Sequence, residues 1–314
     1  MSYTTRKQVE RFIDEYISSR VVVEASVRAI VNRALGYETV FKKSFYDFTK
    51  EEALQMFRES HTISITAIQS ANTILRHASN WMKFEKGENQ TNAYQTITKE
   101  DLKQCIDKEK KNSLLITREQ LNEIQLELLN ATDRAILELL FLGAGGRWCK
   151  ELTFLSRDNL SIADKCIYFK TGKQIHTDTK IINLLLEAFD ETEMVSYSGL
   201  MKISKVKSLG IYKVRSNALS DNTDPSDEKD QERRFRFIQR RLHIISEYVG
   251  VELKASTIQD SGLLHKIKRG ITVSDMPFRE FVNSDQGRAL ARQYDIYTEF
   301  APSVLIAKFI EYFE

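Results

Sequence analysis

The sequence has few of the residues that interrupt helices, with only 3 prolines and 12 glycines among 314 residues. Because proline and glycine are the poorest helix formers, this scarcity favours a mainly α-helical chain. The 3 cysteines are odd in number and form no Cys-x-x-Cys pair, which argues against a disulfide framework or a zinc knuckle. The 5 histidines do not fall at metal-ligand spacings either. We therefore expect no metal and no other cofactor.

Long hydrophobic runs are also missing. No apolar run reaches the roughly 18 residues of a membrane span, and the first residues, from Met1 to Lys7, contain no apolar signal segment. We therefore expect neither secretion nor membrane insertion, and a reducing cytoplasm fits the cysteine usage.

The length and composition suit two globular domains, because the chain is 42% hydrophobic and 29% charged. Residues 107–113 are charged and lack an apolar rhythm. We place a domain boundary there, with a helical domain over residues 1–112 and a second domain over residues 113–314.

Apolar residues at helical spacing predict helices along most of the chain. Residues 23–35 show this spacing before Gly36, which would end the helix, and Thr49 with Glu52 forms a capping-box pattern. Residues 131–142 are apolar nearly all round, so we expect a buried helix. Further helices are expected over residues 64–86, 117–130, 147–155, 180–190, 232–249, 256–269, 276–283 and 302–313.

One β-hairpin is expected in the second domain. Residues 165–170 and 174–177 are short strand candidates, and Thr171-Gly172 between them fits a tight turn. The predicted fold class is therefore mainly α with a small β-hairpin or sheet.

The net charge of +2 conceals a clustering of cations. Residues 199–220 hold five cations and no acid, residues 221–230 are acidic, and residues 233–241 hold five arginines. Clustered cations suit a phosphate backbone, because each neutralised phosphate releases counterions. A solvated helix face is the alternative interpretation. From these runs we predict DNA contacts by Lys202, Lys205, Lys207, Arg233 and Arg234.

A glycine turn, Gly143-Ala-Gly-Gly, comes directly before Arg147, and Glu151 follows four residues later. Such a turn would aim the guanidinium outward, where it can bind a phosphate through two parallel hydrogen bonds. Glu151 would orient Arg147 or cap the turn. The alternative is a plain helix C-cap. A nucleotide-binding loop is disfavoured, because no strand precedes the turn and no Gly-Lys-Ser/Thr ends it.

The stretch from Gly143 to Leu155 resembles the first active-site box of tyrosine recombinases, the phage integrase family. Tyr168-Phe-Lys170-Thr-Gly-Lys173 resembles the β-hairpin of that family, in which the lysine matched by Lys170 enters the minor groove. Residues 49–86 resemble the helical core-binding domain. The resemblance implies a two-domain tyrosine-recombinase-like fold that clamps duplex DNA. It has a core-binding (SAM-like) domain and a catalytic-type domain, with Arg147, Lys170 and Lys173 among the contacts.

The second active-site box of that family, His-x-x-Arg, is altered. Its slots hold Ser256 and Gln259. Serine does not shuttle a proton near neutral pH. Glutamine has no positive charge to stabilise a phosphorane, and the loss of that charge should raise the barrier by roughly 3–4 kcal/mol. Tyr294 and Tyr297 both lie near the nucleophile slot. We therefore expect a catalytically degenerate chain that is not an enzyme, with no catalytic residue; a register shift that used Lys268 or Arg269 would retain activity.

Among degenerate members, the chain is most similar to the repressors that maintain lysogeny in SPbeta-type phages. This implies a transcriptional repressor that binds operator sites on duplex DNA in the nucleoid of a bacterial host, with a peptide or protein antirepressor as a candidate partner. Two alternatives stay open. One is an active or partly active site-specific recombinase. The other is a protein partner of an integrase, docked through the apolar face at residues 304–313, which is also a candidate surface for a homo-oligomer.

Overall fold

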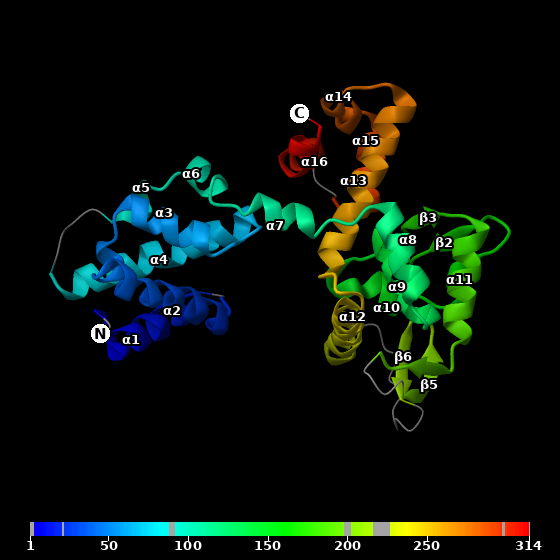
Figure 1. Cartoon of the computed structure of the whole chain (residues 1–314), viewed down its shortest axis with the longest axis horizontal. Helices are drawn as coiled ribbons and strands as arrows, with labels where there is room; N and C mark the ends of the chain where they lie inside the picture. The colour runs from blue at the N-terminus through cyan, green and yellow to red at the C-terminus, as the bar shows by residue number, and fades with distance from the viewer. Residues whose placement is uncertain are drawn as a thin grey trace. The chain divides into compact units, whose positions relative to one another are not determined.

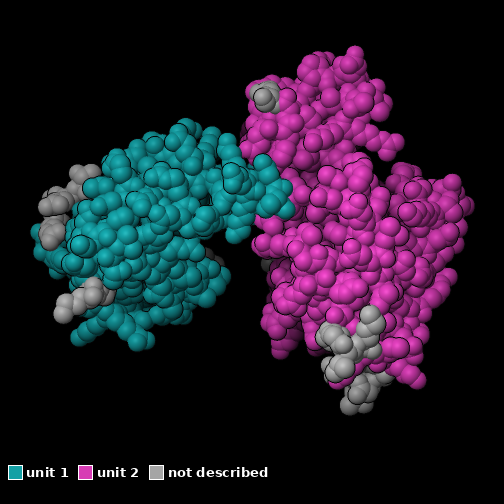
Figure 2. Space-filling model, in the orientation of Figure 1, with its two compact units in different colours: residues 1–113 teal, residues 114–314 magenta. Residues whose placement is uncertain are grey.

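The computed structural model describes residues 3–20, 22–87, 92–197, 202–215, 227–296 and 299–313 (Figure 1). The chain divides into two compact units, residues 1–113 and residues 114–314 (Figure 2). The boundary placed from the sequence lies one residue earlier. Within the described residues, none of the helices combines the length and the apolar character of a membrane-spanning segment.

The first unit is helical, and its helices enclose one hydrophobic core that includes Phe12, Val31 and Leu75. Thr49 caps α3 as predicted, because its side chain accepts from the backbone N–H of Glu52. The helices are α1 (Arg6–Ser18), α2 (Glu24–Phe41), α3 (Lys50–Glu59), α4 (Ile65–Glu85), α5 (Ala93–Thr96), α6 (Lys99–Lys103) and α7 (Lys108–Ser113), with a 3-10 turn, η1, at Phe45–Asp47.

Helix α2 does not end at Gly36, contrary to the prediction. It continues to Phe41 and ends where Lys42 adopts a left-handed φ of 55°. Glu38, in this extra stretch, is buried and accepts hydrogen bonds from the backbone N–H groups of Thr4 (3.0 Å) and Phe45 (3.1 Å). These tertiary bonds outweigh the low helix propensity of one glycine, about 1 kcal/mol.

The second unit is built around α9 (Ala131–Phe141), which is buried along nearly its whole length, as predicted. Helices α8, α11, α12 and α13 contact it. The other helices are α8 (Arg118–Glu127), α10 (Lys150–Thr153), α11 (Thr179–Asp190), α12 (Glu228–Val249), α13 (Ala255–Ser274), α14 (Phe278–Asn283), α15 (Asp285–Gln293) and α16 (Ala301–Phe309), with 3-10 turns η2 (Arg147–Cys149), η3 (Arg157–Asn159) and η4 (Ile310–Tyr312).

Two small antiparallel sheets complete this unit. The first contains the predicted hairpin, in which Ile167 lies opposite Ile175. The second was not predicted, and it includes most of the first cationic run. The strands are β1 (Leu160–Ser161), β2 (Cys166–Tyr168) and β3 (Gln174–His176) in one sheet, and β4 (Glu193–Val195), β5 (Ile203–Leu209) and β6 (Tyr212–Arg215) in the other. The fold class is thus mainly α with small sheets, as the sequence indicates.

The C-terminal helix α16 packs within its own unit. Leu305 and Phe309 are buried, and Ile306, Ile310 and Phe313 pack against the same cluster. The apolar face at residues 304–313 is therefore largely covered by the unit's own core, which leaves little of it for docking on a partner.

Candidate nucleic-acid interface

The glycine turn between α9 and α10 directs its backbone N–H groups at carboxylates. Gly145 N–H donates to Glu151 Oε2 over 2.8 Å, and Gly146 N–H donates to Asp295 Oδ2 over 3.0 Å. Gly143 and Gly146 have φ values of 93° and 70°, in the left-handed region that glycine tolerates best. Successive N–H groups in such turns form concave sites for anions.

Arg147 does not begin a regular helix, contrary to the prediction of a helix over residues 147–155. Residues Arg147–Cys149 form a 3-10 turn in which Trp148 and Cys149 have left-handed φ values of 59° and 53°. Only Lys150–Thr153 are α-helical. The side chain of Arg147 lies outside the described part of the structure, so its phosphate contact stays a prediction.

Glu151 caps the glycine turn, which is one of the two roles expected for it. It is buried and accepts from Gly145 N–H, from Thr171 Oγ1 (3.1 Å) and from Lys173 Nζ (2.9 Å). The carboxylate therefore joins the turn to the β2–β3 hairpin.

Lys173 is part of this internal network. Its ammonium donates to the carbonyl oxygen of Gly143 over 2.7 Å and lies 3.3 Å from Asp295 Oδ1. The side chain is only 6% exposed. Lys173 therefore stabilises the turn from within, and we leave it out of the DNA contacts proposed below.

Lys170 differs from Lys173 although it lies only three residues away. It is exposed in the turn between β2 and β3, a turn closed by hydrogen bonds from Phe169 N–H to Lys173 O and from Gly172 N–H to Phe169 O. An exposed cation at a hairpin tip can reach into a groove of a duplex.

Three lysines of the first cationic run are exposed at the second sheet, whereas Lys213 on β6 is buried. Lys202 precedes β5, and Lys205 and Lys207 lie on it. Because side chains two residues apart share one face of a strand, Lys205 and Lys207 face the same way.

The two neighbouring arginines at the start of α12 differ sharply. Arg233 has a side chain that is 58% exposed. Arg234 is buried: its Nε donates to Asp230 over 2.7 Å, and its guanidinium lies over the rings of Phe154 and Tyr212. Arg234 also donates to the carbonyl oxygen of Thr153, so it packs α12 against α10 and has no surface to offer a phosphate.

The slots of the second box lie at the beginning of α13. Ser256 is exposed, whereas Gln259 is half-buried and donates from Nε2 to the carbonyl oxygen of Ala144 over 3.3 Å. A Cβ atom at Gly145 would lie 2.1 Å from that Nε2 atom. The structure thus brings Gln259 onto the glycine turn and leaves Ser256 at the surface.

Of the two candidate tyrosines, Tyr294 is described and Tyr297 lies outside the described residues. Tyr294 is buried, and its hydroxyl donates to the carbonyl oxygen of Phe141 over 2.6 Å. Burial raises the pKa of this hydroxyl well above its usual 10. A protonated, hydrogen-bonded phenol is a weak nucleophile in this conformation.

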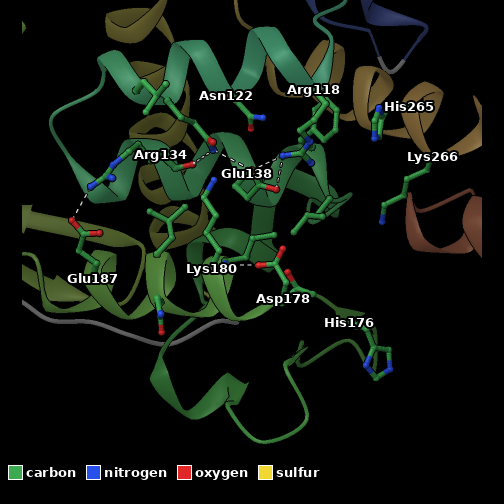
Figure 3. A pocket seen from close by; sticks show the side chains of 18 of the residues that line it. Arg118, Asn122, Arg134, Glu138, His176, Asp178, Lys180, Glu187, His265 and Lys266 are labelled. Atoms are coloured by element: carbon green, nitrogen blue, oxygen red, sulfur yellow. Dashed lines mark hydrogen bonds and ion pairs between the residues drawn. The ribbon is translucent and has the colours of Figure 1, made fainter. Parts of the chain in front are cut away.

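A groove of about 970 Å³ lies next to this site and was not found from the sequence (Figure 3). Arg118 donates to both carboxylate oxygens of Glu138, and Lys266 extends from α13 into the groove. Burial, together with Arg118 and Lys173, lowers the pKa of Lys266 to about 8. The available signal was spacing, since Lys266 lies seven residues after Gln259, about two helical turns along the same face.

Comparisons with solved structures give matches at low identity. A lambda integrase dimer bound to a COC′ core site matches with a TM-score of 0.41 and 13% identity, covering 94% of this chain and 97% of that chain. The Tn1549 transposon integrase in complex with circular intermediate DNA gives the same TM-score, identity and coverage. XerA recombinase matches with a TM-score of 0.33 and 10% identity, covering 96% of this chain and 98% of that chain.

A curated relative comes from Bacillus subtilis (strain 168). It is the SPbeta prophage-derived uncharacterized protein YopR, which is 25% identical over 270 residues, covering 82% of this chain and 79% of the relative.

The family comparison corrects one prediction. A family model described as "MrpR, C-terminal catalytic domain" matches residues 115–312, which is well over half of the chain. Because the family is described as a catalytic domain, the prediction of a chain that is not an enzyme is wrong at the level of the family. That prediction relied on the slots of Ser256 and Gln259, and two altered slots do not remove a chain from a catalytic family. The chain belongs to the family of the MrpR C-terminal catalytic domain.

Proposed function

We propose that this protein binds duplex DNA in a sequence-specific manner and represses phage transcription in a bacterial host, which maintains lysogeny. The observation that carries the proposal is the glycine turn, whose N–H groups at Gly145 and Gly146 are occupied by carboxylates immediately before Arg147. A turn that already binds anionic oxygens suits a backbone phosphate. The prophage origin of the relative YopR supports the phage setting.

Exposed cations extend the proposed interface beyond the turn. Lys170 at the hairpin, Lys202, Lys205 and Lys207 near β5, and Arg233 on α12 are all exposed. Contacts to phosphates position a protein on the duplex, and contacts to base edges give specificity. We therefore assign these cations to phosphate binding and affinity, and we do not assign the base contacts that would select an operator.

The test is capture of genomic DNA. Purified protein is mixed with sheared DNA of a lysogen, and the bound fragments are sequenced. We expect enrichment of a common site, with affinity for that site tighter than for a shuffled duplex by roughly 10³-fold or more. Repression is then measured with a reporter placed behind the enriched site. Equal affinity for the site and the shuffled duplex would contradict a repressor.

A second candidate function is site-specific recombination, which the description of the family as a catalytic domain favours. Arg147 of the first box is followed along the chain by Lys170 of the hairpin and then by the segment that contains Tyr294 and Tyr297. This is the order that the resemblance to tyrosine recombinases implies. A nicked suicide duplex traps the covalent tyrosine–phosphate adduct of such an enzyme. Because the Tyr294 hydroxyl is buried and bonded to Phe141, we expect any adduct to survive Tyr294→Phe and to be lost in Tyr297→Phe.

Two partner predictions remain proposals. A homo-oligomer through α16 would have to use residues left exposed beside the packed face, such as Val304, which is 41% exposed. Light scattering with and without DNA measures that assembly. A peptide or protein antirepressor would be identified by its ability to release the protein from the captured site.

A further inference from the structure

Asp295 lies immediately after Tyr294, far along the chain from the glycine turn that it contacts. Its Oδ2 atom accepts the Gly146 N–H over 3.0 Å, and its Oδ1 atom lies 3.3 Å from Lys173 Nζ. The residue has a left-handed φ of 61°, and its side chain is 25% exposed. The carboxylate therefore lies at the surface of the turn.

The contact with the Gly146 N–H is one that a phosphate oxygen would also make. A backbone N–H in a left-handed turn and a lysine ammonium are donors that suit any anionic oxygen. The two carboxylate oxygens of Asp295 use both donors at once, and Gly146 lies next to Arg147. A DNA phosphate bound by the turn and by Arg147 would compete with Asp295 for the N–H of Gly146.

We propose that Asp295 is a built-in competitor of DNA: its carboxylate occupies the phosphate site of the glycine turn in the free protein and must leave before a backbone phosphate binds there. The inference rests on the proposed DNA binding and adds a regulatory step to it. Asp295 follows Tyr294, and the backbone bonds of Asp295 and Ile296 go to nearby Arg292 and Ala291. Release of the carboxylate breaks the contact between Asp295 and the Gly146 N–H.

The test compares two substitutions that remove the same charge. Asp295→Asn removes the carboxylate at the turn, and Asp285→Asn removes an exposed carboxylate in the first turn of α15. Affinity for one duplex is measured by fluorescence anisotropy at fixed salt. We expect Asp295→Asn to bind about tenfold more tightly than Asp285→Asn, since one charge-assisted contact no longer has to be broken. Equal or weaker binding by Asp295→Asn overturns the proposal.

A measurement on the unaltered protein covers the case in which Asp295→Asn does not fold. Hydrogen exchange is followed for a peptide covering residues 291–296 and for one covering residues 143–149. With DNA bound, the first peptide should exchange faster and the second more slowly. Unchanged or slower exchange at residues 291–296 overturns the proposal. Failure of the unaltered protein to bind any duplex would instead contradict the proposed function itself.

Discussion

The hydroxyl oxygen of Tyr294 lies 2.6 Å from the carbonyl oxygen of Phe141, so the residue after α15 is hydrogen-bonded to the last turn of α9. Gln293 makes a second bond of this kind, from its Nε2 atom to the carbonyl oxygen of Leu142 over 2.8 Å. A residue in the nucleophile slot thereby helps to hold the C-terminal part of the unit against its buried helix.

Tyr294→Phe should lower the stability of the protein by about 1 kcal/mol, the usual net contribution of one hydrogen bond, because the ring can remain in place. Affinity for DNA should stay within a factor of two or so, since the hydroxyl is buried. Urea unfolding and anisotropy on the same sample measure both quantities. A large loss of affinity with unchanged stability would show that the hydroxyl reaches DNA.

Arg234→Ala and Arg233→Ala form a matched pair on one helix. Removing Arg234 leaves the buried carboxylate of Asp230 without its main partner, so we expect a loss of about 3–5 kcal/mol. Removing the exposed Arg233 should change stability by less than about 0.5 kcal/mol and should weaken DNA binding. Thermal melting separates the two variants. Similar melting temperatures would contradict the structural role of Arg234.

Lys266→Met should stabilise the protein most strongly below pH 8. The pKa of Lys266 is about 8 in the folded protein and near its ordinary 10.5 in the unfolded chain. Between these values the unfolded chain binds the proton that the folded chain has lost, so the stability of the unaltered protein rises with pH across this window. Below pH 8 the charge at this half-buried, poorly solvated position costs up to about 3 kcal/mol, which the variant avoids.

The measurement for Lys266 is the difference in unfolding free energy between Lys266→Met and the unaltered protein at several pH values. Taking the difference removes the contributions of other groups, such as Lys213, whose pKa burial also lowers to about 8. The gain should shrink from pH 8 to pH 10.5. A gain that is the same at every pH would mean that packing, and not charge, explains it.

The sequence predicts those elements whose signals are local. Thr49, Thr98 and Thr117 each accept a hydrogen bond from the third residue of the following helix, and such caps are visible as residue patterns. The first hairpin is also local, because Gly172 permits its turn.

Elements that depend on tertiary contacts were missed. In β5, cations occupy alternate positions and hide the strand pattern, and the strand exists because it pairs with both β4 and β6. In α15, the only large apolar residue is Leu290, although Ser284 provides an N-cap that could have indicated the helix.

The candidate site was predicted only in part, for a similar reason. The glycine turn was found from residue types and spacing, and the two boxes were found from the resemblance to tyrosine recombinases. Which hairpin lysine turns inward depends on where Glu151 and the carbonyl of Gly143 lie, and this explains why the Lys173 side chain is only 6% exposed while Lys170 is exposed. The contact of Asp295 with Gly146 joins residues 149 positions apart, which no local pattern indicates.

The most direct test of the account is the salt dependence of duplex binding by the unaltered protein and by Arg147→Ala. A protein that contacts 6–10 phosphates should lose roughly 10³–10⁵-fold in affinity from about 50 to 200 mM salt. Arg147→Ala should bind about one to two decades more weakly and with a shallower salt slope, while its melting temperature stays nearly unchanged. A flat salt response of the unaltered protein, or a folded Arg147→Ala variant that binds DNA normally, would contradict the account.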